Sequence, residues 1–159
     1  MVITETWLSN NVDDSVISLN GFSTFRHDRS DGRRGGGVCV YVNNRFPVFH
    51  LEDLAVPNIE SIWLLLKPSR LPRGFNSIIL GAIYHPPRND DIPLLTHLME
   101  SLDHVLVSNP GAAVILTGDF NQFRHRQLCS SFSLKQIVKR PTRGSNVVDK
   151  NFYQRLEIL

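Results

Sequence analysis

The sequence predicts a mixed α/β (α+β) fold in which packed β-sheets are flanked by helices. Short β-rich runs follow one another with few helical segments between them. Strands and helices also do not alternate regularly, as they would in a doubly wound parallel sheet. The chain has 159 residues, of which 42% are hydrophobic and 20% are charged, an ordinary globular composition. We therefore expect residues 1–159 to form a single domain.

The first half of the chain is predicted to be mostly strands. β-branched and aromatic residues are enriched in five short runs that are separated by turn-forming residues. The last two runs are long and closely spaced, which indicates a hairpin-like antiparallel pair. The five runs cover residues 1–5, 22–26, 37–42, 59–66 and 77–84.

The second half alternates helices and strands. Leucine and valine residues recur at helical spacing over residues 92–107, and Asn109-Pro110-Gly111 ends this helix. A buried strand is predicted for residues 112–119 because the run is apolar and β-branched. Weaker patterns indicate a helix near residues 126–132 and a strand over residues 147–152.

The composition argues against a membrane or secreted protein. The apolar stretches fall far below the roughly 18–20 residues that span a bilayer. The N-terminus lacks the basic and apolar regions of a secretory signal. Cys39 and Cys129 show no metal-type spacing and are too few for a disulfide framework. We expect a nuclear or cytoplasmic location.

Basic residues gather in two segments although the formal net charge is only +2. One segment covers residues 26–34, and the other lies between Asp119 and Asp149, where no acidic residue occurs. Such surfaces suit a polyanionic partner, and an ordinary solvated face is the alternative. The candidate DNA contacts are Arg33, Arg34, Arg124, Arg126 and Arg143.

Gly118-Asp119-Phe120-Asn121 directly follows the apolar run of residues 112–117 and so places Asp119 and Asn121 at the C-terminal end of the predicted strand. Because side chains of extended backbone alternate, both can point the same way while Phe120 points into the protein. A carboxylate and a carboxamide at one point can bind Mg²⁺ or a phosphate oxygen and orient a water. The alternative is a turn in which both side chains bond their own backbone.

Two further polar residues end predicted strands, Glu5 the first and Tyr84 the fifth. In packed sheets these ends can meet Asp119 at one rim. Mg²⁺ takes oxygen ligands, with one or two carboxylates beside waters and substrate phosphate, and Glu5 fits that role. The alternatives are a solvated acid at Glu5 and a rim aromatic at Tyr84.

Six short motifs follow one another along the chain. They are Ile3-Thr4-Glu5-Thr6-Trp7-Leu8, Arg34-Gly35-Gly36-Gly37-Val38, Ile59-Glu60-Ser61-Ile62-Trp63, Tyr84-His85-Pro86-Pro87, Gly118-Asp119-Phe120-Asn121 and Pro141-Thr142-Arg143. Their order resembles that of the endonuclease/exonuclease/phosphatase superfamily. More narrowly, the chain resembles the apurinic-endonuclease-like domain of non-LTR (LINE-type) retrotransposons from Ile3 to about Asp149.

The resemblance implies a four-layer sandwich of two packed mixed sheets flanked by helices. It implies that Glu5 binds Mg²⁺, with Mn²⁺ as the alternative, and that Asp119 orients or deprotonates the attacking water. By similarity Asn121 would bond the scissile phosphate, Tyr84 would contact phosphate or assist the leaving oxygen, and Asp149 would support a catalytic histidine. The implied activity is nicking of double-stranded DNA, and the implied partner is a reverse transcriptase domain in the full-length element.

Two parts of the family pattern are missing from the sequence. These are an earlier strand that carries an Asn and the C-terminal Ser-Asp-His. We expect an incomplete sandwich that is inactive or strongly reduced in activity, because loss of such groups typically lowers a rate by two to four orders of magnitude. The alternatives are a non-catalytic DNA-binding fragment and a decayed mobile-element remnant. A substitute role for His85 is disfavoured because it adjoins Tyr84 and so faces the other side of the strand.

Two other readings of the sequence are weaker. Gly32-Arg33-Arg34-Gly35 matches the GxxG loop of a KH module. A KH loop joins two helices, whereas this one leads into a predicted strand. An RNA or phosphomonoester substrate within the same superfamily has no supporting motif.

Overall fold

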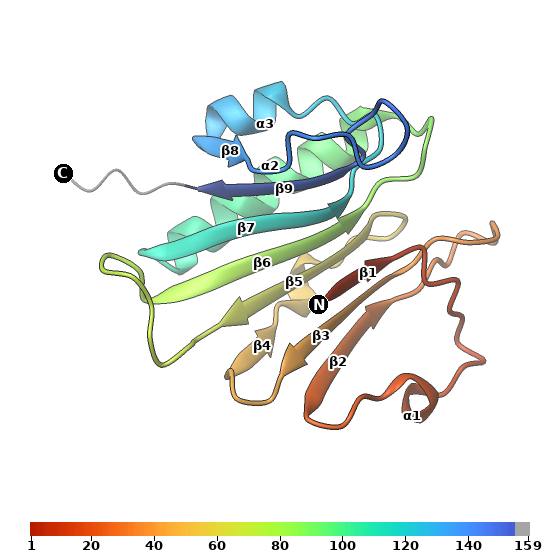
Figure 1. Ribbon diagram of the computed structural model, residues 1–159, viewed down its shortest axis with the longest axis horizontal. Helices are drawn as coiled ribbons and strands as arrows, with labels where there is room; N and C mark the ends of the chain where they lie inside the picture. Colours follow the sequence, from red (N-terminus) through yellow and green to blue (C-terminus); the bar gives the residue numbers. More distant parts are fainter. Residues whose placement is uncertain (155–159) are drawn as a thin grey trace.

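The computed structural model describes residues 1–154 and contains two β-sheets (Figure 1). The smaller, antiparallel sheet has the order β1-β3-β2, with β1 (Val2–Thr4), β2 (Phe22–His27) and β3 (Val38–Asn43). The larger sheet has the order β4-β5-β6-β7-β9-β8. Its strands are β4 (Val48–His50), β5 (Glu60–Leu66), β6 (Ser77–Tyr84), β7 (Ala112–Asp119), β8 (Leu134–Gln136) and β9 (Asp149–Gln154).

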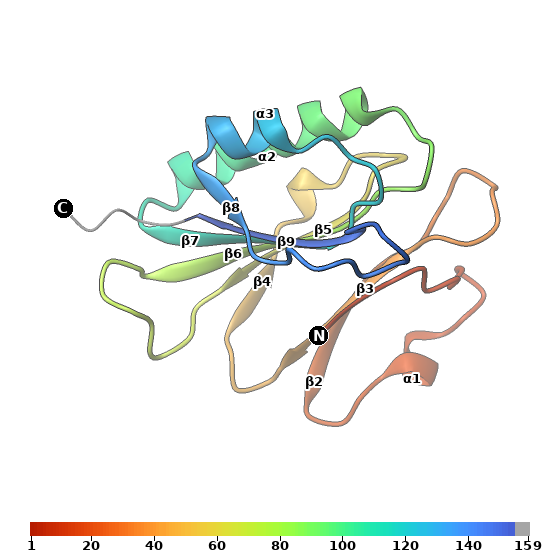
Figure 2. The same cartoon turned by 45° about the horizontal axis from the view of Figure 1, so that its top comes forward.

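Two apolar layers hold the molecule together. Helices α2 (Asp91–Ser108) and α3 (Arg126–Ser131) cover one face of the larger sheet, and the smaller sheet packs on its other face (Figure 2). The layer under the helices includes Trp63, Leu98, Leu102, Leu116, Phe120 and Phe152. The layer between the sheets includes Val38, Val40, Ile62, Leu64, Ala82 and Tyr84.

The outer face of the smaller sheet is covered by the short helix α1 (Asp14–Ile17) and the chain around it. The Tyr41 hydroxyl donates to the Ile17 carbonyl at 2.7 Å. The Arg26 guanidinium donates to the Val12 carbonyl at 2.7 Å and pairs with Asp14 at 2.9 Å. This thin cover is the fourth layer. The prediction of two packed sheets flanked by helices is confirmed, but only the larger sheet is mixed, because every pair in the smaller sheet is antiparallel.

Helix α2 sets the direction in which β7 runs beside β6, and so fixes where the ends of these two strands lie. The Asp90 side chain accepts the Ile92 N–H at 3.1 Å and caps the helix. Its buried face includes Leu94, Leu98 and Leu102. Because α2 carries the chain back across the sheet, β6 and β7 pair in parallel, and their C-terminal ends reach the same rim.

The structure differs from the predicted elements mainly in short segments. The antiparallel pair is confirmed as β5 and β6, which pair from Glu60↔Tyr84 to Leu66↔Ile78. The last strand begins two residues later than predicted. The sequence pattern missed α1, β4, β8 and the 3₁₀ turn η1 (Glu52–Leu54), each three or four residues long. Periodicity needs a longer window than these segments supply. No helix within residues 1–154 is long and apolar enough to cross a bilayer.

Candidate active site

A row of polar side chains crosses four neighbouring strands of the larger sheet. Glu60 on β5 is the register partner of Tyr84 on β6, Tyr84 is that of Asp119 on β7, and Asp119 is that of Asp149 on β9. Register partners point to the same sheet face. Tyr84 packs between the sheets, so the row faces the smaller sheet at one rim. The predicted meeting of Tyr84 and Asp119 at a strand end is present in this structure.

Glu5 reaches the row from just beyond the end of β1. Its Oε1 accepts a hydrogen bond from the Tyr84 hydroxyl, and its Oε2 accepts the Gly36 N–H at 2.9 Å and Trp7 Nε1–H at 2.8 Å. Burial alone would raise the pKa of Glu5, but these hydrogen bonds, that of Tyr84 foremost, bring the pKa below its usual value. Glu5 is therefore a carboxylate at neutral pH.

The glycine-rich loop lets the backbone approach Glu5 closely. Gly35 has φ +81°, and a Cβ there would lie 3.2 Å from both Glu5 Oε2 and the Trp7 ring. The Gly36 N–H can reach the carboxylate because no side chain intervenes at this point. Contact with the Glu5 segment thus explains Gly35, which faces Glu5 and Trp7, and Gly37, which faces Thr6, whereas Gly36 leaves room for Arg29.

Tyr84 is buried, and its hydroxyl is held by Glu5. The Arg29 guanidinium lies 5.7 Å from the centre of its ring. Burial, and then the bond to Glu5, raise the pKa of Tyr84 well above its usual value. At neutral pH the hydroxyl keeps its proton and acts as a hydrogen-bond donor.

Asp119 is half-buried, and burial raises its pKa. The charges of Asp149 and Glu5 raise this pKa further, while the Asn121 N–H and the charge of Arg143 lower it. Asp119 Oδ1 accepts the Asn121 N–H at 2.9 Å. Of the turn considered as an alternative, only the Asp119 half is formed, and it uses one of the two carboxylate oxygens. The Asn121 side chain bonds the His85 carbonyl instead of its own backbone.

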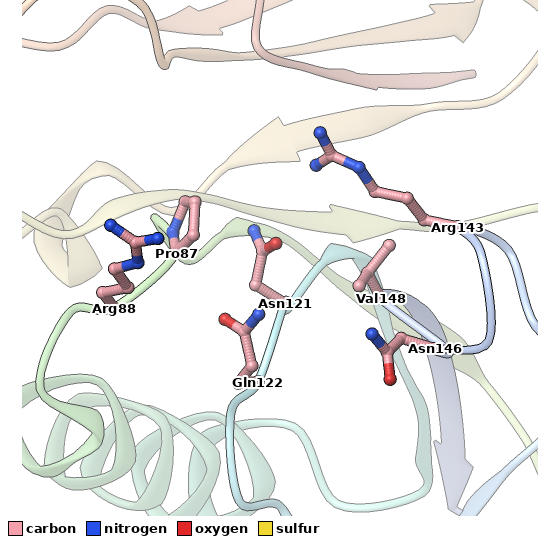
Figure 3. A pocket seen from close by; sticks show the side chains of 7 residues that line it. All are labelled: Pro87, Arg88, Asn121, Gln122, Arg143, Asn146 and Val148. Carbon is pink, nitrogen blue, oxygen red and sulfur yellow. The ribbon is translucent and has the colours of Figure 1, made fainter.

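Asn121 is buried and is among the residues that line a pocket of about 450 Å³ (Figure 3). Its Nδ2 donates to the His85 carbonyl at 2.8 Å, which leaves the second N–H of the carboxamide for another acceptor. Arg88 and Arg143 stand on either side of Asn121 in Figure 3. The other lining residues are Pro87, Gln122, Asn146 and Val148.

The five predicted DNA contacts lie in three places. Arg143 lines the Asn121 pocket. Arg33 and Arg34 lie in the glycine-rich loop, where Arg33 pairs with Asp31 at 2.5 Å and reaches Asn89 Oδ1 at 3.3 Å. Arg124 and Arg126 lie on the helix side, in a second pocket beside α2, and the Arg124 side chain pairs with Asp91 at 3.1 Å. The structure does not bring these five residues into one cluster.

Asp149 lies at the exposed end of the row, and its own N–H donates to Thr142 Oγ1 at 3.1 Å. Within residues 1–154 no histidine pairs with its carboxylate. His85 faces the helix side, where Nε2 lies 3.1 Å from Asp91 Oδ1 and the ring meets Phe123 edge-on. The expectation that His85 and Tyr84 face opposite sides is confirmed.

Sequence reasoning missed a buried ion pair behind the site. Glu60 accepts from Arg29 Nε at 2.7 Å and from the Gly37 N–H, and it is 5% exposed. The signal was a glutamate at the start of an apolar strand, which requires a partner when it is buried. This pair supports the site by fixing both the glycine-rich loop and the cation over the Tyr84 ring.

Solved structures with a similar fold include an endonuclease domain and a 2′,3′-cyclic phosphatase. The endonuclease domain of TRAS1, a telomere-specific non-LTR retrotransposon, superposes with a TM-score of 0.58 at 16% identity over 86% of this chain and 68% of that domain. ANGEL2, a 2′,3′-cyclic phosphatase, gives 0.58 at 15% identity over 86% of this chain. An endonuclease/exonuclease/phosphatase family protein from Bacteroides thetaiotaomicron superposes with a TM-score of 0.52 at 14% identity over 89% of this chain.

The chain spans 63% of the ANGEL2 chain and 64% of the Bacteroides protein. A comparison with curated protein sequences gave no significant match. The model of the endonuclease/exonuclease/phosphatase family matches residues 1–145, which contain the Glu5, Tyr84 and Asp119 segments. The chain belongs to the endonuclease/exonuclease/phosphatase family.

Proposed function

We propose that this chain hydrolyses phosphodiester bonds in double-stranded DNA with the help of Mg²⁺, as the endonuclease domain of a non-LTR retrotransposon. The observation that supports this most is the meeting of Glu5, Tyr84 and Asp119 at one rim, beside the Asn121 pocket. The fold of a retrotransposon endonuclease is among those it resembles. A reverse transcriptase would be the partner in the full-length element.

The residues at the rim fit a magnesium ion. Glu5, Asp119 and Asp149 offer carboxylate oxygens, which Mg²⁺ prefers, and Mn²⁺ accepts the same donors. Within residues 1–154 no group of three or more His, Cys, Asp or Glu side chains forms a metal cage. Mg²⁺ can also bind through one carboxylate, with waters and substrate phosphate as its other ligands. Glu5 would hold the ion, which would neutralise charge on the phosphate.

Asp119 is the proposed base. Its raised pKa makes it a better proton acceptor than an ordinary aspartate, and Oδ2 remains free of the turn that uses Oδ1. The water oxygen would bond to phosphorus, the water proton would pass to Asp119, and the bond from phosphorus to the 3′ oxygen would break, with that oxygen taking a proton from solvent water. The products would be a 3′ hydroxyl and a 5′ phosphate.

The neighbouring side chains position the phosphate. The second N–H of Asn121 and the guanidinium of Arg143 are donors at the same pocket. The protonated Tyr84 hydroxyl can donate to a phosphate or leaving oxygen. Asp149 would act through its charge, which raises the pKa of Asp119. Its support of a catalytic histidine stays a prediction.

Nicking of supercoiled plasmid in Mg²⁺ tests the proposal. Asp119→Asn and Glu5→Gln keep side-chain shape and should each lower the rate by about 10²–10⁴-fold. Asp103→Asn makes the same chemical change on an exposed turn of α2 and should nick like the wild type. Absence of nicking by the wild type, or equal nicking by Asp119→Asn, would contradict the proposal.

The second candidate is a non-catalytic DNA-binding fragment or a decayed remnant. It is favoured by the bonds that already engage both oxygens of Glu5 and one oxygen of Asp119. Salt-dependent binding of duplex DNA in EDTA without any nicking would support the binding fragment. If the chain shows neither DNA binding nor nicking, the remnant is supported. Hydrolysis confined to RNA or phosphomonoesters would mean that the chain acts on a different substrate class within the family.

A further inference from the structure

Trp7 is unusual because a large aromatic side chain stands in solvent beside the candidate site. It is 66% exposed, yet its indole N–H donates to Glu5 Oε2 at 2.8 Å. Its φ is +58° and that of Glu5 is +57°, a backbone region that bulky residues rarely adopt. Such backbone persists where surrounding contacts impose it, and it occurs often at functional sites.

The contacts that impose it come from the glycine-rich loop. The Trp7 N–H donates to the Gly36 carbonyl at 2.9 Å, and the Thr6 N–H donates to the Gly37 carbonyl at 3.4 Å. The indole ring packs where Gly35 has no side chain. Backbone contacts between the Glu5–Trp7 segment and the glycine-rich loop therefore fix the indole N–H against Glu5.

Counting acceptor sites shows what this bond does to Glu5. A carboxylate has about four lone-pair sites, two on each oxygen. On Oε2 the Gly36 N–H and Trp7 Nε1–H fill both sites. On Oε1 the Tyr84 hydroxyl fills one. One acceptor site remains, and it belongs to Oε1.

We propose that Trp7 is a positioning residue that restricts Glu5 to one-point binding of a metal ion through Oε1 and so favours Mg²⁺ over Ca²⁺. Mg²⁺ keeps its waters and takes single carboxylate oxygens, whereas Ca²⁺ accepts two-point carboxylates and higher coordination. A variant that lacks the Trp7 N–H frees Oε2 and should lose the preference for Mg²⁺ over Ca²⁺. The inference rests on the metal-binding role of Glu5 in the proposed function.

The test measures ion binding without DNA. Electron paramagnetic resonance of free Mn²⁺ gives the affinity of the full chain for Mn²⁺, and competition with Mg²⁺ or Ca²⁺ gives relative affinities. Trp7→Phe keeps an aromatic ring and loses the N–H. Because one hydrogen bond is lost, the preference for Mg²⁺ over Ca²⁺ should fall by about two- to tenfold. Trp7→Leu loses the ring as well and should show the same fall.

Glu5→Gln separates the two hypotheses. If the wild type binds Mn²⁺ and Glu5→Gln does not, the metal role of Glu5 stands; an unchanged Mg²⁺ to Ca²⁺ ratio in Trp7→Phe then overturns the Trp7 inference alone. Equal binding by the wild type and Glu5→Gln, or no binding by either, overturns both. A shift in Trp7→Leu but not in Trp7→Phe would assign the effect to the ring and overturn the lone-pair explanation. Circular dichroism checks that each variant is folded.

Discussion

Asp119 and Asp149 are register partners on the antiparallel strands β7 and β9, so two carboxylates share one face at the rim of the larger sheet. Asp119 is the half-buried member, and Asp149 is exposed. Like charges at short range disfavour ionisation of the less solvated group. The pair therefore links the acidity of a proposed base to a neighbour that need not touch the substrate.

Replacing Asp149 should change the pH dependence of hydrolysis. Burial contributes most to the raised pKa of Asp119, and the charge of Asp149 contributes less. Asp149→Asn removes that charge, so the pKa of Asp119 should fall and the acid limb of the rate profile should move to lower pH. Nicking rates of the wild type and Asp149→Asn measured from pH 4 to pH 8 give the two midpoints. Coincident midpoints would show that Asp149 does not tune the base.

Arg143 should contribute about one phosphate contact to DNA binding. It lines the pocket that contains Asn121, whereas Arg33 already pairs with Asp31. Each neutralised phosphate contributes about 0.9 to the slope of log K against log salt concentration. Arg143→Ala should reduce the slope by about 1 in fluorescence anisotropy titrations of duplex DNA in EDTA. Arg45→Ala removes an exposed arginine after β3, at the sheet end away from the rim, and serves as control. If both variants have the same slope of log K against log salt concentration, Arg143 does not contact a DNA phosphate.

The sequence was sufficient for the strand that carries the proposed base, because a buried strand has a strong composition signal. Ala112 to Asp119 form β7 as predicted, and Phe120 points into the core. The meeting of Tyr84 with Asp119 depends on information beyond local composition. It follows from the parallel register that α2 imposes on β6 and β7, and no local pattern contains a register.

The contacts around Glu5 are a second feature that could not be predicted from the sequence. Its partners Gly36 and Tyr84 lie 31 and 79 residues away in the chain, so their contacts are properties of the tertiary fold. The five predicted DNA-contact arginines are separated in space for the same reason. Arg124 and Arg143 are near in sequence, but Arg124 pairs with Asp91 beside α2 while Arg143 faces the Asn121 pocket.

Gly118 should be irreplaceable for packing reasons. Its φ is +138°, and a Cβ at this position would collide with the Ile83 carbonyl oxygen of the neighbouring strand β6. Gly118→Ala should lower the free energy of unfolding by about 2–4 kcal/mol, because both the backbone and the contact become strained. Gly21→Ala is the control, since Gly21 has φ +83° with no atom within 4 Å and should cost about 1 kcal/mol. Urea unfolding of both variants measures the difference, and equal losses would mean that the collision relaxes easily.

His97 should make the fold sensitive to acid. It is buried on α2, where Trp63 Nε1–H donates to its Nε2 at 3.2 Å and Ser61 Oγ lies 3.1 Å from the same atom. Nε2 must therefore be the unprotonated nitrogen. Burial lowers the pKa of His97 from its usual value of 6.5 to about 4. Protonation would place a second N–H against the Trp63 donor.

The sign of the effect follows from the two pKa values. Between pH 6.5 and about 4 the unfolded chain binds a proton at His97 that the folded chain does not. The stability associated with a neutral His97 is complete above pH 6.5 and is lost as the pH falls toward 4, by about 2–3 kcal/mol. His97→Gln keeps an acceptor for Trp63 and cannot titrate in this range. Urea unfolding from pH 7.5 to pH 4.5 should show a stability difference, wild type minus variant, that declines below pH 6.5. A difference that stays constant would mean that the pKa of His97 is the same in the folded and the unfolded chain.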